Sequence, residues 1–196
     1  MRVISGTAKG RRLKAPPGLN TRPVTDMIKE ALFNVWGSRV LDACVLDLFA
    51  GSGSVGIEAL SRGARKVIFV DNSNAAVRVI RENLDHCRFQ SGFDILRGDV
   101  FQALKRLVSQ GLQFDLVYID PPFTREDIFE PLMEAVSRAD ILSADGIAVI
   151  RSPRKKAMPS FPLLVKYRQG DYGESSLHYY CRCEEEPNDD GDISHS

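Results

Sequence analysis

Short apolar runs alternate with helical patterns along the middle of the chain, and this alternation constrains the fold more than any other feature. Strands that are apolar throughout belong to a parallel sheet that helices cover on both faces, joined by right-handed crossovers. The periodicity predicts strands over residues 45–49, 66–71, 94–99, 114–120 and 146–152, and helices over residues 54–63, 75–87, 100–111 and 128–139.

Both ends of the chain add elements to this core. The runs at residues 163–169 and 176–183 are joined by the Gly-rich sequence GDYGES, which suits an antiparallel hairpin. Residues 2–5 and 11–14 flank GTAKG as a second small hairpin, and a helix capped by Thr25 follows it. The expected fold is α/β, with a mostly parallel seven-stranded sheet, helices on both faces, a C-terminal antiparallel hairpin, and an N-terminal hairpin and helix.

The composition is that of a soluble globular protein. The chain has 196 residues, of which 43% are apolar and 27% are charged, enough for one core of ordinary size. No apolar run approaches the ~20 residues of a membrane span, and the N-terminal sequence lacks the apolar stretch of a signal peptide, so we expect a cytoplasmic protein. Cys181 and Cys183 are too closely spaced for the usual metal or redox pairs, so we expect reduced thiols and no metal.

The loop after the first core strand has the pattern of a nucleotide-type site. In DLFAGSGSVG, Gly51, Gly53 and Gly56 satisfy G-x-G-x-x-G, and Asp71 ends the next strand. Ligands of such sheets bind beyond the carboxyl ends of the strands, where glycines allow close approach and a helix offers free N–H groups. Asp71 can accept hydrogen bonds from ribose hydroxyls. This pattern fits a dinucleotide as well as any other adenosyl ligand.

Asp47 narrows the choice of ligand. It lies inside the first core strand, four residues before Gly51, and a buried acid at this place needs a donor or a cation. A pyrophosphate would repel the carboxylate, whereas the ammonium or sulfonium group of S-adenosylmethionine would not. The sequence therefore favours S-adenosylmethionine over a dinucleotide.

The sequence YIDPPF ends the fourth core strand with an acid, two prolines and an aromatic ring. Proline cannot donate to a strand ladder, so the strand stops and a stiff turn begins. DPPF resembles motif IV of the methyltransferases that act on exocyclic amines of nucleobases. Such an amine is a poor nucleophile, and the resemblance implies that the Asp120 carboxylate and the Pro121 carbonyl accept its two N–H hydrogens while the Phe123 ring stacks on the flipped base. We expect Asp120, Pro121, Pro122 and Phe123 to be the catalytic residues.

These motifs resemble those of a known superfamily. DLFAGSG resembles motif I of the Rossmann-like, class I methyltransferases, and DPPF resembles their motif IV in enzymes that methylate exocyclic base amines. Asp99 matches the position that holds the adenine amino group, although it also suits a helix N-cap. The resemblance implies S-adenosylmethionine as the cofactor and a binding set at the strand ends: Asp47, Gly51, Ser52, Gly53, Asp71, Asn72, Asp99 and Val100. The segment RP-x-TD before the first helix is similar to an extra motif of the RsmD family that closes over the methionine end of the cofactor, which implies a contact from Thr25.

A longer resemblance covers about residues 1–123. The segments MRVISGTAKGRRLKAP, TRPVTDMIKEALFNVW, VLDLFAGSGSVGIEALSRGA and FDLVYIDPPF are similar in order and spacing to those of the RsmD family. That family implies methylation of the N2 amine of a guanine in small-subunit (16S) ribosomal RNA, within a 30S assembly intermediate, by a bacterial cytoplasmic monomer. Phe123 stands where the family more often has tyrosine, and the segment after Arg151 is unlike the family's usual ending; both departures concern target choice.

Charge is distributed unevenly along the chain. Residues 1–40 carry eight Lys or Arg against two acids, residues 151–183 carry seven against two, and residues 184–196 carry six acids and no base. Such asymmetry indicates a polyanion partner. We expect RNA contacts from basic residues at both ends, those near the N-terminus on a hairpin projecting from the core: Lys9, Arg11, Arg12, Lys14, Arg22, Lys29, Arg154, Lys155 and Lys156.

The expected division of the chain has three parts. Residues 1–40 form an N-terminal extension, residues 41–183 the methyltransferase domain, and residues 184–196 an acidic tail with no apolar face to bury, which we expect to be disordered.

Three other functions share parts of this pattern. A DNA adenine-N6 methyltransferase has the same catalytic motifs, but only 40 residues precede the core, too few for a separate target domain. An NAD-dependent oxidoreductase would give Asp47 and DPPF no role. A non-catalytic RNA-binding module on the same fold would not need Asp120.

Overall fold

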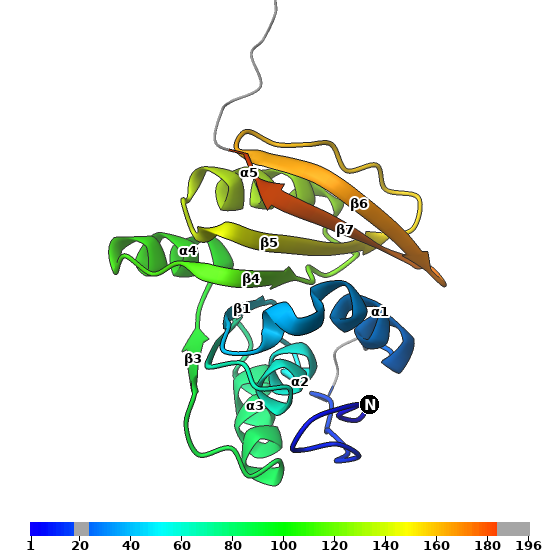
Figure 1. Ribbon diagram of the computed structural model, residues 1–196, viewed down its shortest axis with the longest axis vertical. Helices are drawn as coiled ribbons and strands as arrows, with labels where there is room; N and C mark the ends of the chain where they lie inside the picture. Colours follow the sequence, from blue (N-terminus) through cyan, green and yellow to red (C-terminus); the bar gives the residue numbers. More distant parts are fainter. Residues whose placement is uncertain (18–23, 184–196) are drawn as a thin grey trace, which may run out of the picture.

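A computed structural model describes residues 1–17 and 24–183, and its centre is one seven-stranded sheet (Figure 1). The strand order is β3-β2-β1-β4-β5-β7-β6. Strands β1 to β5 run parallel, whereas β7 is antiparallel to both β5 and β6, as the sequence predicts. The bounds are β1 Cys44–Leu48, β2 Lys66–Asp71, β3 Phe93–Arg97, β4 Phe114–Ile119, β5 Leu142–Pro153, β6 Leu164–Tyr172 and β7 Ser175–Arg182.

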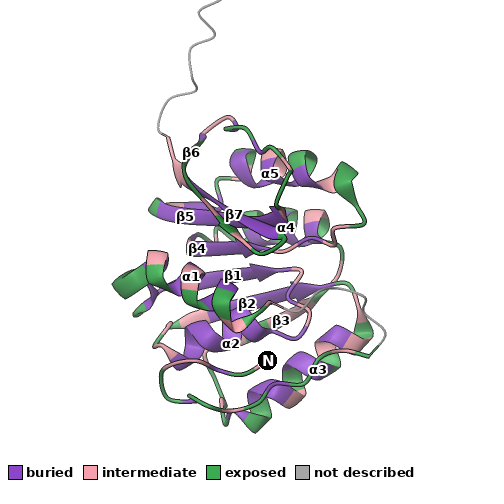
Figure 2. Ribbon diagram, turned by 90° about the vertical axis from the view of Figure 1, so that its right-hand side faces the viewer, coloured by how far each residue is buried: buried purple, intermediate pink, exposed green. Residues whose placement is uncertain are grey.

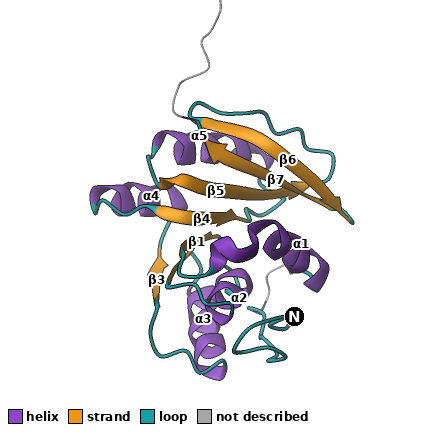
Figure 3. Cartoon of the chain, viewed as in Figure 1, coloured by secondary structure: helices purple, strands orange, loops and turns teal. Residues whose placement is uncertain are grey.

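Helices cover both faces of the sheet; β1, β2, β4, β5 and β7 are mostly buried, whereas the two edge strands β3 and β6 are largely half-buried or exposed (Figures 2 and 3). The α-helices are α1 Asp26–Trp36, α2 Ser54–Ser61, α3 Asn74–His86, α4 Val100–Ser109 and α5 Phe129–Arg138, with 3-10 turns at η1 Gly37–Val40 and η2 Glu126–Ile128. Helices α1, α2 and α3 share one apolar cluster with the sheet, and α4 and α5 share the other. Within β1, Val45 belongs to the first cluster while Leu46 and Leu48 belong to the second, which explains why this strand is apolar throughout.

Element ends follow the predicted signals closely. The Thr25 hydroxyl accepts a hydrogen bond from the Ile28 amide and caps α1, as predicted. Strand β5 begins four residues earlier than the sequence suggests, because Leu142 pairs with Phe114 across an irregularity in the register with β4. Within the two described ranges, no helix is long and apolar enough to cross a membrane.

The N-terminal arm, residues 1–14, packs on the core instead of projecting from it, which corrects the expectation of a separate hairpin. Its two halves meet at a single antiparallel bridge, Arg2 with Arg12. Val3, Ala8 and Leu13 are buried in the same apolar cluster as α1, α2 and α3. The arm is therefore a part of the hydrophobic core.

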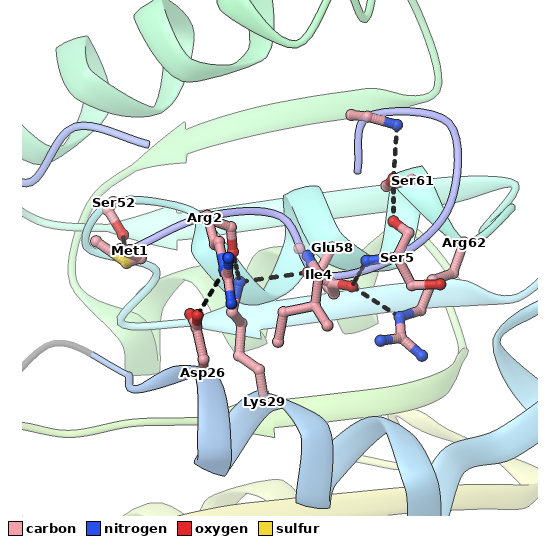
Figure 4. Close-up of polar contacts among 12 residues, drawn as sticks. Met1, Arg2, Ile4, Ser5, Asp26, Lys29, Ser52, Glu58, Ser61 and Arg62 are labelled. Carbon is pink, nitrogen blue, oxygen red and sulfur yellow. Dashed lines mark hydrogen bonds and ion pairs between the residues drawn. The ribbon is translucent and has the colours of Figure 1, made fainter. Parts of the chain in front are cut away.

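Glu58 in α2 anchors this arm (Figure 4). Its fully buried carboxylate accepts hydrogen bonds from four groups: the amides of Ile4 (2.7 Å) and Ser5 (2.9 Å), Arg62 Nε (2.8 Å) and Lys29 Nζ (3.3 Å). The Lys29 ammonium also donates to the Arg2 carbonyl and has no exposed surface. The prediction that Lys29 contacts RNA is therefore wrong, because this charge is neutralised inside the protein.

Candidate active site at the carboxyl edge of the sheet

The loops that follow the parallel strands meet at one edge of the sheet, the carboxyl edge. Leu48 at the end of β1 is in register with Val70 of β2 and with Ile119 of β4. The glycine loop after β1 therefore lies between Asp71, the last residue of β2, and Asp120, the residue after β4. The sheet brings together residues that are far apart in the sequence.

The three glycines of the loop have different roles. Gly51 and Gly53 have φ of 56° and 74°, in the left-handed region that favours glycine, and Gly53 precedes the first residue of α2. A Cβ atom on Gly51 would meet nothing closer than the Phe49 carbonyl oxygen at 3.9 Å, so this side of the loop is open to a ligand. A Cβ atom on Gly56 would lie 2.3 Å from the Phe69 ring, so this glycine allows α2 to pack closely on β2.

Asp71 connects the glycine loop to the next helix. One carboxylate oxygen accepts the Gly51 amide hydrogen at 2.8 Å, and the other accepts that of Ser73 at 2.9 Å. Each carboxylate oxygen has a second lone pair, so these bonds are compatible with further bonds from ribose hydroxyls. Asp71 is thus placed both to shape the loop and to bind a ligand held there.

Asp47 is buried beneath this loop, with 2% of its surface exposed. Its carboxylate accepts the amide hydrogen of Gly56 in the first turn of α2 at 3.0 Å. Burial raises the pKa of Asp47 well above that of an ordinary aspartate; the Gly56 bond acts in the opposite direction, and Asp120 and Asp71 raise the pKa further. Asp47 is therefore close enough to feel the charges of both Asp120 and Asp71, and a cation bound near Asp47 would relieve that repulsion.

These residues fit S-adenosylmethionine. The acidic environment of Asp47 disfavours a pyrophosphate and suits an ammonium or sulfonium group, while Gly51 leaves the backbone open and Asp71 offers carboxylate oxygens. S-adenosylmethionine is the cofactor whose charge and hydroxyl groups match this set.

The other predicted cofactor residues lie around the same loops. Asp99 caps α4 by accepting the amide hydrogens of Phe101 and Gln102, both through Oδ1, so neither bond occupies Oδ2. Ser52 is almost buried; its hydroxyl donates to Met1 Sδ at 3.3 Å and its carbonyl accepts from Asn83 Nδ2. The remaining three differ in exposure, with Asn72 and Thr25 exposed and Val100 buried.

Asp120 begins the Pro-Pro turn directly beside the glycine loop. Its amide donates to the Leu48 carbonyl at 3.2 Å, which ties the turn to the end of β1. Arg151 Nη1 lies 3.1 Å from Oδ2 and 3.4 Å from Oδ1, and the Tyr118 hydroxyl lies 3.4 Å from Oδ2. Burial raises the pKa of Asp120 above the ordinary value, and Arg151 acts in the opposite direction by favouring the carboxylate.

Phe123 ends this turn as a half-buried ring. The ring packs at a tilt against Phe129, with 6.4 Å between the two ring centroids. The Arg151 guanidinium lies 5.1 Å from the centroid of the Phe123 ring. Pro121 is buried and Pro122 half-buried, so the turn is fixed between the sheet and solvent. Asp120 and Phe123, at the two ends of the turn, thus both contact Arg151.

Arg151 and Tyr118 are site residues that the sequence analysis does not identify. Arg151 interrupts the apolar run GIAVIRS, as Asp47 interrupts VLDLF. A charged residue inside an otherwise apolar core strand is the sequence signal by which Arg151 could have been identified. Asp120 and Arg151 each follow a pair in register, Ile119 with Ile150, so the pairing of β4 with β5 brings them together.

The predicted RNA contacts form two groups. In the arm, Lys9 and Arg12 are exposed, whereas Lys14 pairs with Glu82 at 2.8 Å and Arg11 donates to the His86 carbonyl. After β5, Lys155 is exposed, Arg154 pairs with Asp171 at 3.5 Å, and Lys156 lies over the Phe129 ring. Arg22 lies outside the described residues.

Comparison with known proteins identifies relatives along nearly the whole chain. Residues 1–181 match the family model described as Conserved hypothetical protein 95. The chain is 38% identical over 181 residues to "Putative rRNA methyltransferase YlbH" of Bacillus subtilis, covering 92% of this chain and 98% of that protein. It is 30% identical over 162 residues to ribosomal RNA small subunit methyltransferase D of Escherichia coli, covering 83% and 79% respectively.

Solved structures share the same architecture. "Putative methyltransferase yhhF" from Escherichia coli superposes with a TM-score of 0.81 at 28% identity, covering 93% of this chain and 97% of that one. A further methyltransferase structure, a complex with SAH, has a TM-score of 0.63 at 15% identity, covering 79% and 49%; at that identity the likeness concerns the fold alone.

Sheet order, glycine loop and strand-end acids together define a Rossmann-like, class I methyltransferase fold. The chain belongs to the Conserved hypothetical protein 95 family, the RsmD family, whose relatives include the small-subunit ribosomal RNA methyltransferases. The predictions of fold and family are confirmed.

Proposed function

We propose that this protein transfers a methyl group from S-adenosylmethionine to the exocyclic N2 amine of a guanine in small-subunit ribosomal RNA. The observation that carries the proposal is the rigid turn after β4, which ties Asp120 to the end of β1, where the glycine loop begins, and presents the Phe123 ring from the same turn. Support for ribosomal RNA as the substrate comes from the names of the relatives. The guanine N2 target comes from the resemblance of the motifs.

Asp120 prepares the amine for attack. Its carboxylate and the Pro121 carbonyl accept the two N–H hydrogens, which moves the nitrogen toward tetrahedral geometry and frees its lone pair. The bound cofactor supplies a methyl group on a sulfonium centre. As the N–C bond forms and the C–S bond breaks, the nitrogen becomes cationic and acidic, and Asp120 can take its proton.

The turn holds its reactive groups in position, so that substrate binding need not order them. Two prolines and the bond from the Asp120 amide to Leu48 hold the carboxylate in place before the substrate arrives. The Phe123 ring, half-buried against Phe129, offers a surface for a base turned out of its stack. Thr25, Ser52, Asn72, Asp99 and Val100 complete the proposed cofactor set.

Exposed cations hold the RNA in this proposal. Lys9 and Arg12 on the arm, and Arg154 and Lys155 after β5, can contact phosphates without reading sequence. In this proposal the substrate is RNA within a 30S assembly intermediate, and the protein acts as a cytoplasmic monomer.

Mass spectrometry of ribosomal RNA tests the proposal. A strain that lacks the gene should lose one N2-methylguanosine from the small-subunit RNA, and purified protein with labelled S-adenosylmethionine should restore it. Incorporation of label into adenine of DNA, with none into the ribosomal RNA, would instead support the DNA methyltransferase alternative.

A further inference from the structure

Arg151 is a buried cation at the end of β5 with contacts to two of the proposed catalytic residues. Only 3% of its surface is exposed. Nη1 lies 3.1 and 3.4 Å from the two oxygens of Asp120, Nε donates to the Ser175 hydroxyl at 3.1 Å, and the guanidinium lies over the Phe123 ring. Taking both charges of an ion pair out of water is costly even when they meet, so this arrangement requires an explanation.

We propose that Arg151 is a positioning residue for methyl transfer, which orients the Asp120 carboxylate and the Phe123 ring as a single unit. The inference rests on the proposed function, because it assigns Arg151 to the reaction through Asp120. The predicted catalytic residues all belong to the turn DPPF, and Arg151 is not among them.

The geometry requires an arginine rather than any cation. The guanidinium is flat and rigid, so when Nη1 meets the carboxylate and Nε meets Ser175, the orientation of its plane over Phe123 is fixed as well. A lysine ammonium could balance the charge of Asp120 but could not make these three contacts together.

The charges around Asp120 give Arg151 a second effect. The groups that face this carboxylate are the Tyr118 hydroxyl from β4, Arg151 from β5 and the Asp47 carboxylate from β1, and Asp71 from β2 lies next to Asp47. Burial favours a protonated Asp120, and Arg151, together with the hydrogen bond from Tyr118, opposes it. Without Arg151, protonation of Asp120 should therefore persist to higher pH.

The sign of the expected pH effect follows from the mechanism. Asp120 must be ionised to accept the amine hydrogens, so the methylation rate rises as pH increases through the Asp120 pKa. Removing Arg151 raises that pKa, so the acid limb of the pH–rate profile should move to higher pH.

The experiment compares Arg151→Met and Arg151→Lys with the parent and with Arg138→Met, an exposed arginine of α5 paired with Glu134. Single-turnover methylation of small-subunit ribosomal RNA is measured across pH, with cofactor affinity measured by calorimetry. We expect Arg151→Met to lower the rate by about 10²-fold and to move the acid limb upward, with cofactor affinity unchanged. Arg151→Lys should keep the acid limb near that of the parent and still lower the rate, and Arg138→Met should match the parent.

A second readout does not depend on turnover. Carbon-13 NMR of labelled aspartate carboxyls, assigned with Asp120→Asn, follows the titration of Asp120 directly. It should titrate at higher pH in Arg151→Met than in the parent. An unchanged Asp120 titration, or a lysine variant as fast as the parent, would overturn the inference even if the methionine variant fails to fold. A parent that binds S-adenosylmethionine and methylates no RNA would instead refute the proposed function, and the titration would still decide the role of Arg151.

Discussion

At the residue scale, burial and hydrogen bonding give the three carboxylates of the carboxyl edge different roles. Asp47 is buried and its bond to Gly56 joins β1 to α2, so it mainly shapes the site and its charge. Asp71 accepts two loop amides, and Asp120 faces a buried arginine and a tyrosine. These different partners lead to different expectations for substitution.

Asp71→Ala should weaken S-adenosylmethionine binding strongly. The change removes the proposed ribose acceptor and also the partner of the Gly51 amide, which shapes the loop. Losing a charged hydrogen-bond partner costs ~1.5–3 kcal/mol, or roughly ten- to a hundredfold in affinity. Calorimetry provides the measurement, with Asp94→Ala, an exposed acid of β3 paired with Lys66, as the control. Equal affinities for parent and Asp71→Ala would remove Asp71 from the site.

Asp120→Asn should keep cofactor affinity and lose most of the turnover. Asparagine has nearly the same volume, but it lacks the charge and the basicity that the amine requires. A positioned general base contributes typically ~10²–10⁴-fold in rate, so single-turnover methylation should slow by about that factor. Asp127→Asn, an exposed acid of η2 paired with Arg125, should retain the parent rate. Parent-like methylation by Asp120→Asn would refute the assigned role.

At the scale of elements, the glycine loop and α2 depend on close packing against β2. Gly56→Ala would place a methyl group 2.3 Å from the Phe69 ring, which is itself fully buried. Overpacking of this kind costs about 1–3 kcal/mol, so urea unfolding should show a destabilised protein. Gly98→Ala is the matched control, because its added Cβ would meet nothing within 4 Å. Equal stability of the two variants would mean that α2 can shift away from β2 at little cost.

Helix α2 also holds the N-terminal arm through Glu58. Glu58→Gln removes the charge that neutralises Lys29 and weakens the acceptor for the Ile4 and Ser5 amides. Breaking a buried ion pair on one side costs roughly 3–5 kcal/mol, so denaturant unfolding should show a large loss of stability. Glu134→Gln, which breaks the exposed pair with Arg138, should change stability little. A small effect of Glu58→Gln would show that the arm is held by its apolar residues alone.

At the scale of the whole molecule, the fold and the position of the candidate site at the carboxyl edge could be predicted from sequence, because they depend on local periodicity and on the convergence of strand ends. Asp47, Asp71 and Asp120 lie together for that reason. Contacts that depend on strand register or on docking of the arm could not be predicted, such as Arg151 on Asp120. The prediction of an RNA contact at Lys29 fails because charge alone indicates a surface position, whereas the spacing of Lys29 from Phe33 and Trp36 matches the buried face of α1.

The two groups of bases predicted to contact RNA, in the arm and after β5, permit a test of where RNA binds. Arg154 and Lys155 follow β5 at the same edge as Asp120, and both are exposed, although Arg154 also pairs with Asp171. Replacing Arg154 and Lys155 with alanine should therefore weaken binding of small-subunit ribosomal RNA while cofactor affinity stays constant. If both touch phosphates, the slope of log affinity against log salt should become shallower by about 1.4, at ~0.7 per contact on single strands.

Lys105 and Arg106, exposed bases of α4, provide the control pair, and their replacement with alanine should leave the slope unchanged. An unchanged slope for Arg154 and Lys155, with a shallower one after replacing Lys9 and Arg12, would place the RNA surface on the arm instead.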